Sequence, residues 1–153
     1  MRNIEVNLLT DIRRFLLFFG LCFFVTGCGF FEPGLYKVCE DTLQKRLQSP
    51  SGYKRAGINS YVEKMTVADY EEKILSPLTD KERENFNNGK AVPTRHILFI
   101  EYDAPNIYGT PIRELAKCEY FSQYGNADSA SVHNVRINDQ TNSEWLLSQV
   151  ERF

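Results

Sequence analysis

The feature that most constrains the fold is the stretch RHILFIEYDAPNIYGTPIRELAKCEYF at residues 95–121. Both of its ends are rich in isoleucine, tyrosine and phenylalanine, which favour β-strands. The segment between them contains five residues that are typical of turns: Asp103, Pro105, Asn106, Gly109 and Pro111. The stretch therefore predicts a β-hairpin.

Side chains on the second strand of this hairpin alternate between two faces. One face carries Ile112, Glu114, Ala116, Cys118 and Tyr120, and the other carries Arg113, Leu115, Lys117, Glu119 and Phe121. Upstream, the sequence from Leu35 to a turn at residues 49–52 has the apolar spacing of an amphipathic helix. The apolar positions are Leu35, Val38, Cys39, Leu43 and Leu47. If Cys118 meets Cys39, the first strand face lies under this helix.

The remaining segments complete a small sheet. Residues 53–67 predict a strand with a bend or bulge at Gly57, because their apolar residues do not alternate cleanly. We expect the charged residues 68–90 to be the most exposed insert, with a short helix that begins at a capping box at residues 79–82. Residues 132–138 predict a short strand.

A second capping box, at residues 141–144, predicts a last helix. Its apolar side consists of Trp145, Leu146, Val150 and Phe153. Together these elements predict a single α+β domain over residues 35–153. Its small antiparallel sheet has about four strands, covered mainly on one face, with an N-terminal and a C-terminal helix.

The first 27 residues have the pattern of an export signal. Arg2, Arg13 and Arg14 precede an unbroken apolar run at residues 15–25. A secretory signal contains about 7–15 apolar residues, whereas a membrane-spanning helix needs about 20. We therefore expect residues 1–27 to be a cleaved signal peptide. The alternative is an uncleaved membrane helix that extends through residues 29–31.

The sequence Val25-Thr26-Gly27-Cys28 resembles the lipobox of bacterial prolipoproteins, in which small residues precede the cysteine that receives lipid. The resemblance implies that Cys28 carries a diacylglycerol on its sulfur and, after cleavage, a fatty acid such as palmitate on its amino group. Several acyl chains imply lasting membrane anchorage, because each buried methylene contributes about 0.8 kcal/mol. Residues 28–34 would then be a lipidated tether. Gly29 favours the outer membrane, with the domain facing the periplasm.

The signal accounts for Cys22 and the lipid for Cys28, so that Cys39 and Cys118 remain. An even pair of cysteines in an oxidising compartment predicts one disulfide bond. Closing this loop would stabilise the fold by roughly 4 kcal/mol. The alternative is a pair of buried free thiols.

Composition and motifs give little reason to expect catalysis or the binding of a cofactor or metal. Signal cleavage would change the formal net charge from −2 to about −3, because it removes three arginines and two carboxylates. This balance does not indicate a nucleic-acid partner. The two histidines, His96 and His133, are far apart, and the chain has no CxxC, HExxH, GxGxxG, GxSxG or P-loop pattern. We expect no enzyme activity, no cofactor and no metal site.

The segments SPSGYK and EYDAPNIYGTPIRELAKCEYF are also similar to parts of a small domain of bacterial envelope proteins, a resemblance that implies no activity. We expect a non-enzymatic interaction module with an envelope protein partner. The candidate contact loop comprises Asp103, Pro105, Asn106, Ile107, Tyr108 and Gly109. Its prolines would stiffen a polar loop that presents an isoleucine and a tyrosine. In the structural alternative, Asn106 and Gly109 only supply positive φ angles, and Tyr108 folds back onto the sheet.

Two other functions stay open. Glu101 and Asp103 share a strand face at a spacing of roughly 7 Å, which suits an inverting glycosidase that acts on cell-wall glycans, or an inhibitor of such an enzyme. Ordinary solvated carboxylates explain the same pattern. Tyr102, Tyr120 and Phe121 are candidates for a small-ligand site, although core packing explains them as well.

Overall fold

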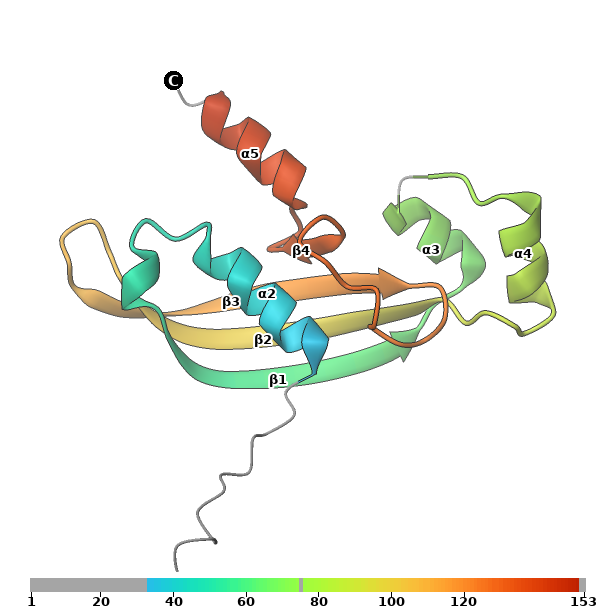
Figure 1. Ribbon diagram of the computed structural model, residues 1–153, viewed down its shortest axis with the longest axis horizontal. Coiled ribbons are helices and arrows are strands. Elements are labelled where there is room, and N and C mark those ends of the chain that lie inside the picture. The colour runs from blue at the N-terminus through green and yellow to red at the C-terminus, as the bar shows by residue number, and fades with distance from the viewer. Residues whose placement is uncertain (1–32, 75, 152–153) are drawn as a thin grey trace, which may run out of the picture. The chain divides into compact units, whose positions relative to one another are not determined.

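The computed structural model describes residues 33–74 and 76–151, which belong to one compact unit. Four strands form one antiparallel sheet in the order β1-β2-β3-β4 (Figure 1). The strands are β1 (Lys54–Lys64), β2 (Thr94–Pro105), β3 (Pro111–Ser122) and β4 (Val135–Ile137). With helix α2 (Gly34–Gln44) before the sheet and helix α5 (Asn142–Val150) after it, the structure confirms the predicted α+β class.

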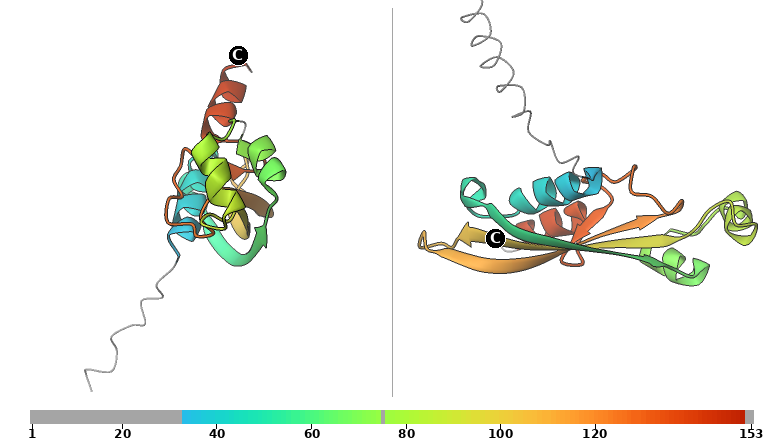
Figure 2. Two further views of the ribbon diagram at one scale, coloured as in Figure 1. Left: turned by 90° about the vertical axis from the view of Figure 1, so that its right-hand side faces the viewer. Right: turned by 90° about the horizontal axis from the view of Figure 1, so that it is seen from below.

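Helix α2 covers one face of the sheet (Figures 1 and 2). Its buried apolar side chains, Leu35, Cys39 and Leu43, recur every four residues and therefore lie on one side of the helix. Cys39 forms the predicted disulfide bond with Cys118 of β3, with the two Cα atoms 5.9 Å apart. Both cysteines are completely buried. The bond therefore joins the helix to the sheet inside the main core, which also contains Leu98, Ile100, Ala116, Val135 and Ile137.

The chain turns sharply between α2 and β1. Helix α2 ends at Gln44, earlier than the apolar spacing predicts, but Leu47 still packs against the main core. A short 3-10 turn, η1 (Pro50–Gly52), then leads into β1. The pairing of β1 with β2 shifts register between Arg55 and Gly57, where the sequence predicts a bulge.

Residues 68–90 contain two helices, whereas the sequence pattern predicts one. The predicted helix is α4 (Asp80–Asn87), and Thr79 caps it in the expected capping box. The additional helix is α3 (Val67–Ile74). The hydroxyl of Thr66 accepts a hydrogen bond from the backbone N–H of Asp69 (3.1 Å), which explains why α3 begins there.

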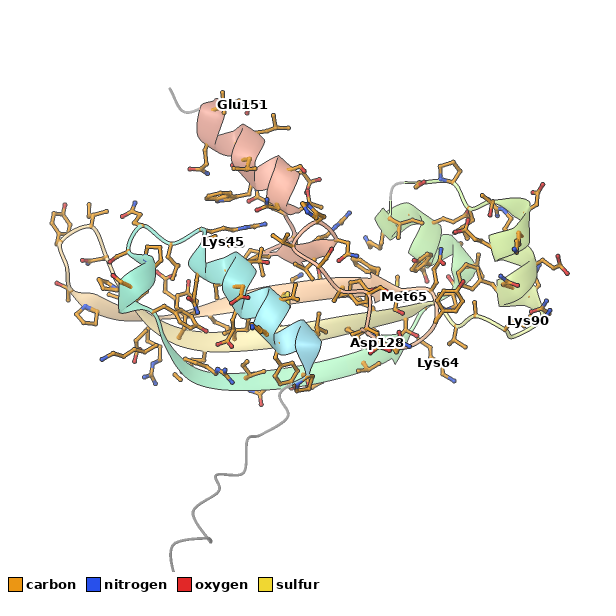
Figure 3. The ribbon with its side chains drawn as sticks, in the orientation of Figure 1. Lys45, Lys64, Met65, Lys90, Asp128 and Glu151 are labelled. Carbon is orange, nitrogen blue, oxygen red and sulfur yellow. A yellow bond between two sulfur atoms is a disulfide. The ribbon has the colours of Figure 1, made fainter. Side chains whose placement is uncertain are left out.

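These two helices bury a second, smaller core, which the expectation of the most exposed insert did not include. Tyr70, Leu78, Phe86 and Ala91 are buried together, and Met65 packs against them (Figure 3). The rings of Tyr70 and Phe86 meet edge to face, with their centres 5.7 Å apart. Apolar contacts therefore stabilise the insert, although most of its residues are charged or polar.

Strand β4 is shorter than the predicted strand at residues 132–138. Residues 131–134 form a turn instead, in which the side chain of Asn134 accepts a bond from the Ser131 N–H (2.7 Å) and donates one to the Ser129 carbonyl (3.0 Å). These bonds stabilise the turn and delay the start of the strand until Val135.

Helix α5 begins at the predicted capping box, where Thr141 is the N-cap. None of its described residues is buried, and Leu146 and Val150 on its predicted apolar side are largely exposed. Trp145 lies against the guanidinium of Arg46, whose central carbon is 5.5 Å from the ring centre. Among residues 33–74 and 76–151, no helix combines the length and apolar character that crossing a membrane requires.

Candidate functional site

The hairpin forms, and its turn is tighter than the sequence predicts. Strands β2 and β3 pair without a register shift up to Pro105 opposite Pro111, so the turn comprises only residues 106–110. Asp103 and Pro105, which we expect in the loop, therefore lie in β2. The strands continue this far because Asp103 pairs with Arg113 across them and because proline is tolerated at strand ends.

Asn106 holds the turn. Its side-chain oxygen accepts hydrogen bonds from the backbone N–H groups of Tyr108 (2.9 Å) and Thr110 (3.0 Å). Its backbone carbonyl accepts one from Gly109 (2.9 Å). Gly109 has the expected positive φ, 80°, whereas Asn106 does not, so that half of the expectation is wrong. The side chain of Asn106 stabilises the turn instead.

Ile107 and Tyr108 project from this turn into solvent. Ile107 is 69% exposed and Tyr108 is 84% exposed, so Tyr108 does not fold back onto the sheet. Together they place two apolar side chains at the tip of the hairpin, which we call the hairpin tip. An apolar tip on a bonded turn is typical of a contact site.

The base of the hairpin is braced on both sides. The guanidinium of Arg113 donates two hydrogen bonds to the carboxylate of Asp103 (2.8 and 2.9 Å), and this contact lowers the pKa of Asp103. On the other side, η1 touches Pro105. A Cβ on Gly52 would lie 2.3 Å from the Pro105 Cδ, so this approach requires glycine. The hairpin tip therefore stands on a rigid base.

A hollow of about 310 Å³ lies beside the hairpin tip. Ile107 forms part of its wall, together with Ile112 and Glu114 of β3 and Arg46 and Leu47 after α2. Arg46 and Leu47 belong to no site predicted from the sequence. No local signal could have identified them, because they reach the hollow only through the docking of α2 on the sheet.

Glu101 and Asp103, the candidate catalytic pair, lie on the sheet face opposite α2. Arg113 contacts both carboxylates, and the distance from its Nη1 to Glu101 Oε1 is 3.6 Å. Neither carboxylate lines the hollow beside the hairpin tip. The two side chains are therefore partners of one guanidinium.

The three candidate ligand-binding aromatics lie in two different places. Tyr102 is buried, and its hydroxyl donates a hydrogen bond to Glu114 (2.7 Å). Burial, together with this carboxylate, raises the pKa of Tyr102. Tyr120 and Phe121, near the other end of β3, line a second cavity of about 420 Å³. Tyr120 and Phe121 therefore line a cavity, whereas Tyr102 belongs to the main core.

The two histidines and Cys28 are the other residues considered in the sequence, and only the histidines belong to the described residues 33–74 and 76–151. There, no group of three or more histidine, cysteine or carboxylate side chains is placed to bind a metal ion. His96 is in β2 and His133 lies in the turn before β4. Cys28, the predicted lipidation site, lies outside the described residues.

Comparisons with known proteins add no relative. No protein-family model, curated protein or solved structure matches the chain. Function must therefore be inferred from the sites themselves.

Proposed function

We propose that this chain is a lipid-anchored protein of the bacterial envelope whose hairpin tip binds a protein partner. The anchor follows from the resemblance of residues 25–28 to a lipobox, with Cys28 as the acylated residue. The outer membrane is the proposed location, and the domain would face the periplasm.

The exposure of Ile107 and Tyr108 on a braced turn is the observation that carries the proposal. Asn106, Gly109 and the ion pair at Asp103 fix the shape of the turn before any partner binds. A preformed apolar contact loses little conformational entropy on binding. The adjoining hollow offers room for an apolar side chain of the partner.

Site-specific photo-crosslinking in intact cells tests this proposal. A photoreactive amino acid replaces Tyr108, and in a parallel strain it replaces Leu147, an exposed apolar residue of α5. The proposal expects one discrete protein adduct from position 108 and none of the same mass from position 147. No adduct at 108, or the same adduct at both positions, would overturn it.

Two variants complete the design. Ile107→Ala with Tyr108→Ala should weaken co-purification of the crosslinked partner from solubilised envelopes, and Leu146→Ala with Leu147→Ala is the matched control. Cys28→Ala, exported by a soluble signal, tests the anchor separately. Equal recovery of the partner with both double variants would reject the hairpin tip as the contact site.

A further inference from the structure

The short β4 leaves part of β3 without a strand neighbour on that side. Strand β4 pairs with β3 only as far as Tyr120, whereas β3 continues to Ser122. The loop of residues 123–134, which carries Asp128 (Figure 3), and helix α3 border this edge and the 420 Å³ cavity. Small-molecule sites in proteins typically measure about 300–1,000 Å³.

The cavity wall carries positive charge and no carboxylate. Arg136 of β4 and Lys73 of α3 line it together with His133, and Lys73 forms an ion pair with Glu72 (3.1 Å), which does not line the cavity. Arg136 donates one hydrogen bond from Nη2 to the Lys73 carbonyl (2.7 Å), and its guanidinium lies 5.6 Å from the centre of the Phe121 ring. Among the described residues it forms no ion pair, although Glu144 lies close enough to have its pKa lowered by Arg136.

Most of the hydrogen-bonding capacity of Arg136 is therefore not used by the described part of the chain. A guanidinium has five N–H donors in a planar fork, which fits the two oxygens of a carboxylate or phosphate group. Because Arg136 forms no ion pair among the described residues, its charge in the cavity wall attracts an anion.

The rest of the wall combines aromatic rings with neutral polar groups. Tyr124 contributes a ring that is 61% exposed, and the largely buried Tyr70 and Tyr120 form the floor behind it. Burial raises the pKa of Tyr70 to about 12, so its hydroxyl stays protonated at neutral pH. The amide side chain of Asn126 supplies both donors and acceptors, and that of Asn134, which already bonds to Ser131 and Ser129, has one of each left. This mixture matches a ring that has apolar faces and several hydroxyl groups.

We propose that this cavity binds an acidic monosaccharide unit. Its carboxylate or phosphate group would accept hydrogen bonds from Arg136. Its ring would lie against the tyrosine rings, and its hydroxyl groups would bond to the amide side chains. The anion and the ring together define the ligand class, which includes sugar acids and sugar phosphates.

This site is independent of the proposed protein contact. The hairpin tip precedes Pro111 at the start of β3, whereas residues 120–122 at its end line the cavity. Figure 1 shows the hairpin turn and helix α3 at opposite ends of the strand. The 12 residues of β3 span roughly 35–40 Å at about 3.3 Å per residue. Loss of one activity with retention of the other would therefore distinguish the two proposals.

Calorimetric titration of the full protein in detergent tests the ligand class. The probes are glucuronate, glucose 6-phosphate and glucose, which differ in the acidic group. The proposal expects saturable binding of at least one acidic probe with a Kd of about 1 mM or tighter, and at least about tenfold weaker binding of glucose. The preference between the two acids identifies the group that Arg136 selects. No saturable binding of either acid, or equal binding of glucose, would overturn the proposal.

Variants then locate the site. Arg136→Gln should weaken binding of the preferred acid about tenfold or more, because it removes a charge-assisted hydrogen bond. Arg113→Gln, a change in a paired arginine outside the cavity, should leave binding unchanged. If Arg136→Gln does not fold, Lys73→Gln and Tyr124→Ala replace it as tests, because they change exposed side chains of the cavity wall. Unchanged affinity in the folded cavity variants would overturn the assignment.

Discussion

Reduction of the Cys39–Cys118 bond should strongly destabilise the domain. The two cysteines are 79 residues apart in the sequence, so the bond closes a long loop in the unfolded chain. In the chain-entropy model, opening such a loop lowers the free energy of unfolding by about 4.5 kcal/mol at 25 °C. A domain of this size is typically stable by only about 6–18 kcal/mol. The disulfide bond would therefore contribute a large share of the free energy of unfolding.

The measurement is a pair of urea unfolding curves, followed by far-UV circular dichroism, for the oxidised protein and for protein unfolded and refolded in reductant. Both samples carry Cys28→Ala, so that only the bridge differs. The reduced form should also show a larger m-value, because its unfolded chain exposes more surface. Its melting temperature should fall by roughly 15–20 °C.

Two results would refute this reasoning. A loss of less than about 1 kcal/mol would mean that the denatured chain stays compact without the bridge, against the loop-entropy argument. Reaction of unreduced protein from the envelope with two equivalents of a thiol reagent would show that the bond is absent in cells.

Three further predictions concern local contacts. Glu40→Ala should lower the free energy of unfolding in urea by about 2 kcal/mol, because Glu40 is 7% exposed and its carboxylate binds Arg55 and Tyr53. An unfolding free energy equal to that of the wild type within error would contradict this prediction. Glu82 has a lowered pKa because the backbone N–H and hydroxyl of Thr79 donate to it, so its stabilising effect is present at neutral pH and is lost as the pH falls through that pKa. Thr79→Ala should raise this pKa toward its usual value in a carboxyl-carbon NMR titration, and an unchanged pKa would exclude the hydroxyl as a cause. Arg46→Ala should shift the emission of Trp145, the single tryptophan, to longer wavelength, and an identical spectrum would show that Arg46 does not shield the ring.

The sequence was sufficient where a local pattern determines structure. Helical spacing placed Cys39 on the buried side of α2, and strand alternation placed Cys118 on the covered face of β3. Both capping boxes marked true helix starts, at Thr79 and Thr141. The missed helix α3 had a similar signal, because Thr66 and Asp69 bond to each other as a capping pair.

The remaining features depend on contacts between distant segments. Tyr70, Leu78 and Phe86 are widely spaced in a charged stretch, and they become a core only when α3 and α4 meet. The same holds for both candidate sites. The hollow beside the hairpin tip needs Arg46, and the larger cavity needs Arg136 next to α3. The periodicity of one segment cannot predict such tertiary contacts.

Charge pairing separates the structural surface from the candidate ligand site. On the sheet face opposite α2, Arg95 contacts Glu119 and Glu63, Arg113 contacts Asp103, and Lys117 contacts Asp139 and Glu119. The charged side chains in these pairs, including the buried Glu119, neutralise one another and leave little free charge for a ligand. Arg136 occupies a strand position directly opposite Glu119, yet Glu119 bonds to Arg95 instead. The charge of Arg136 is thereby left for the cavity, which is the reason to look for an anion there and not on the open face of the sheet.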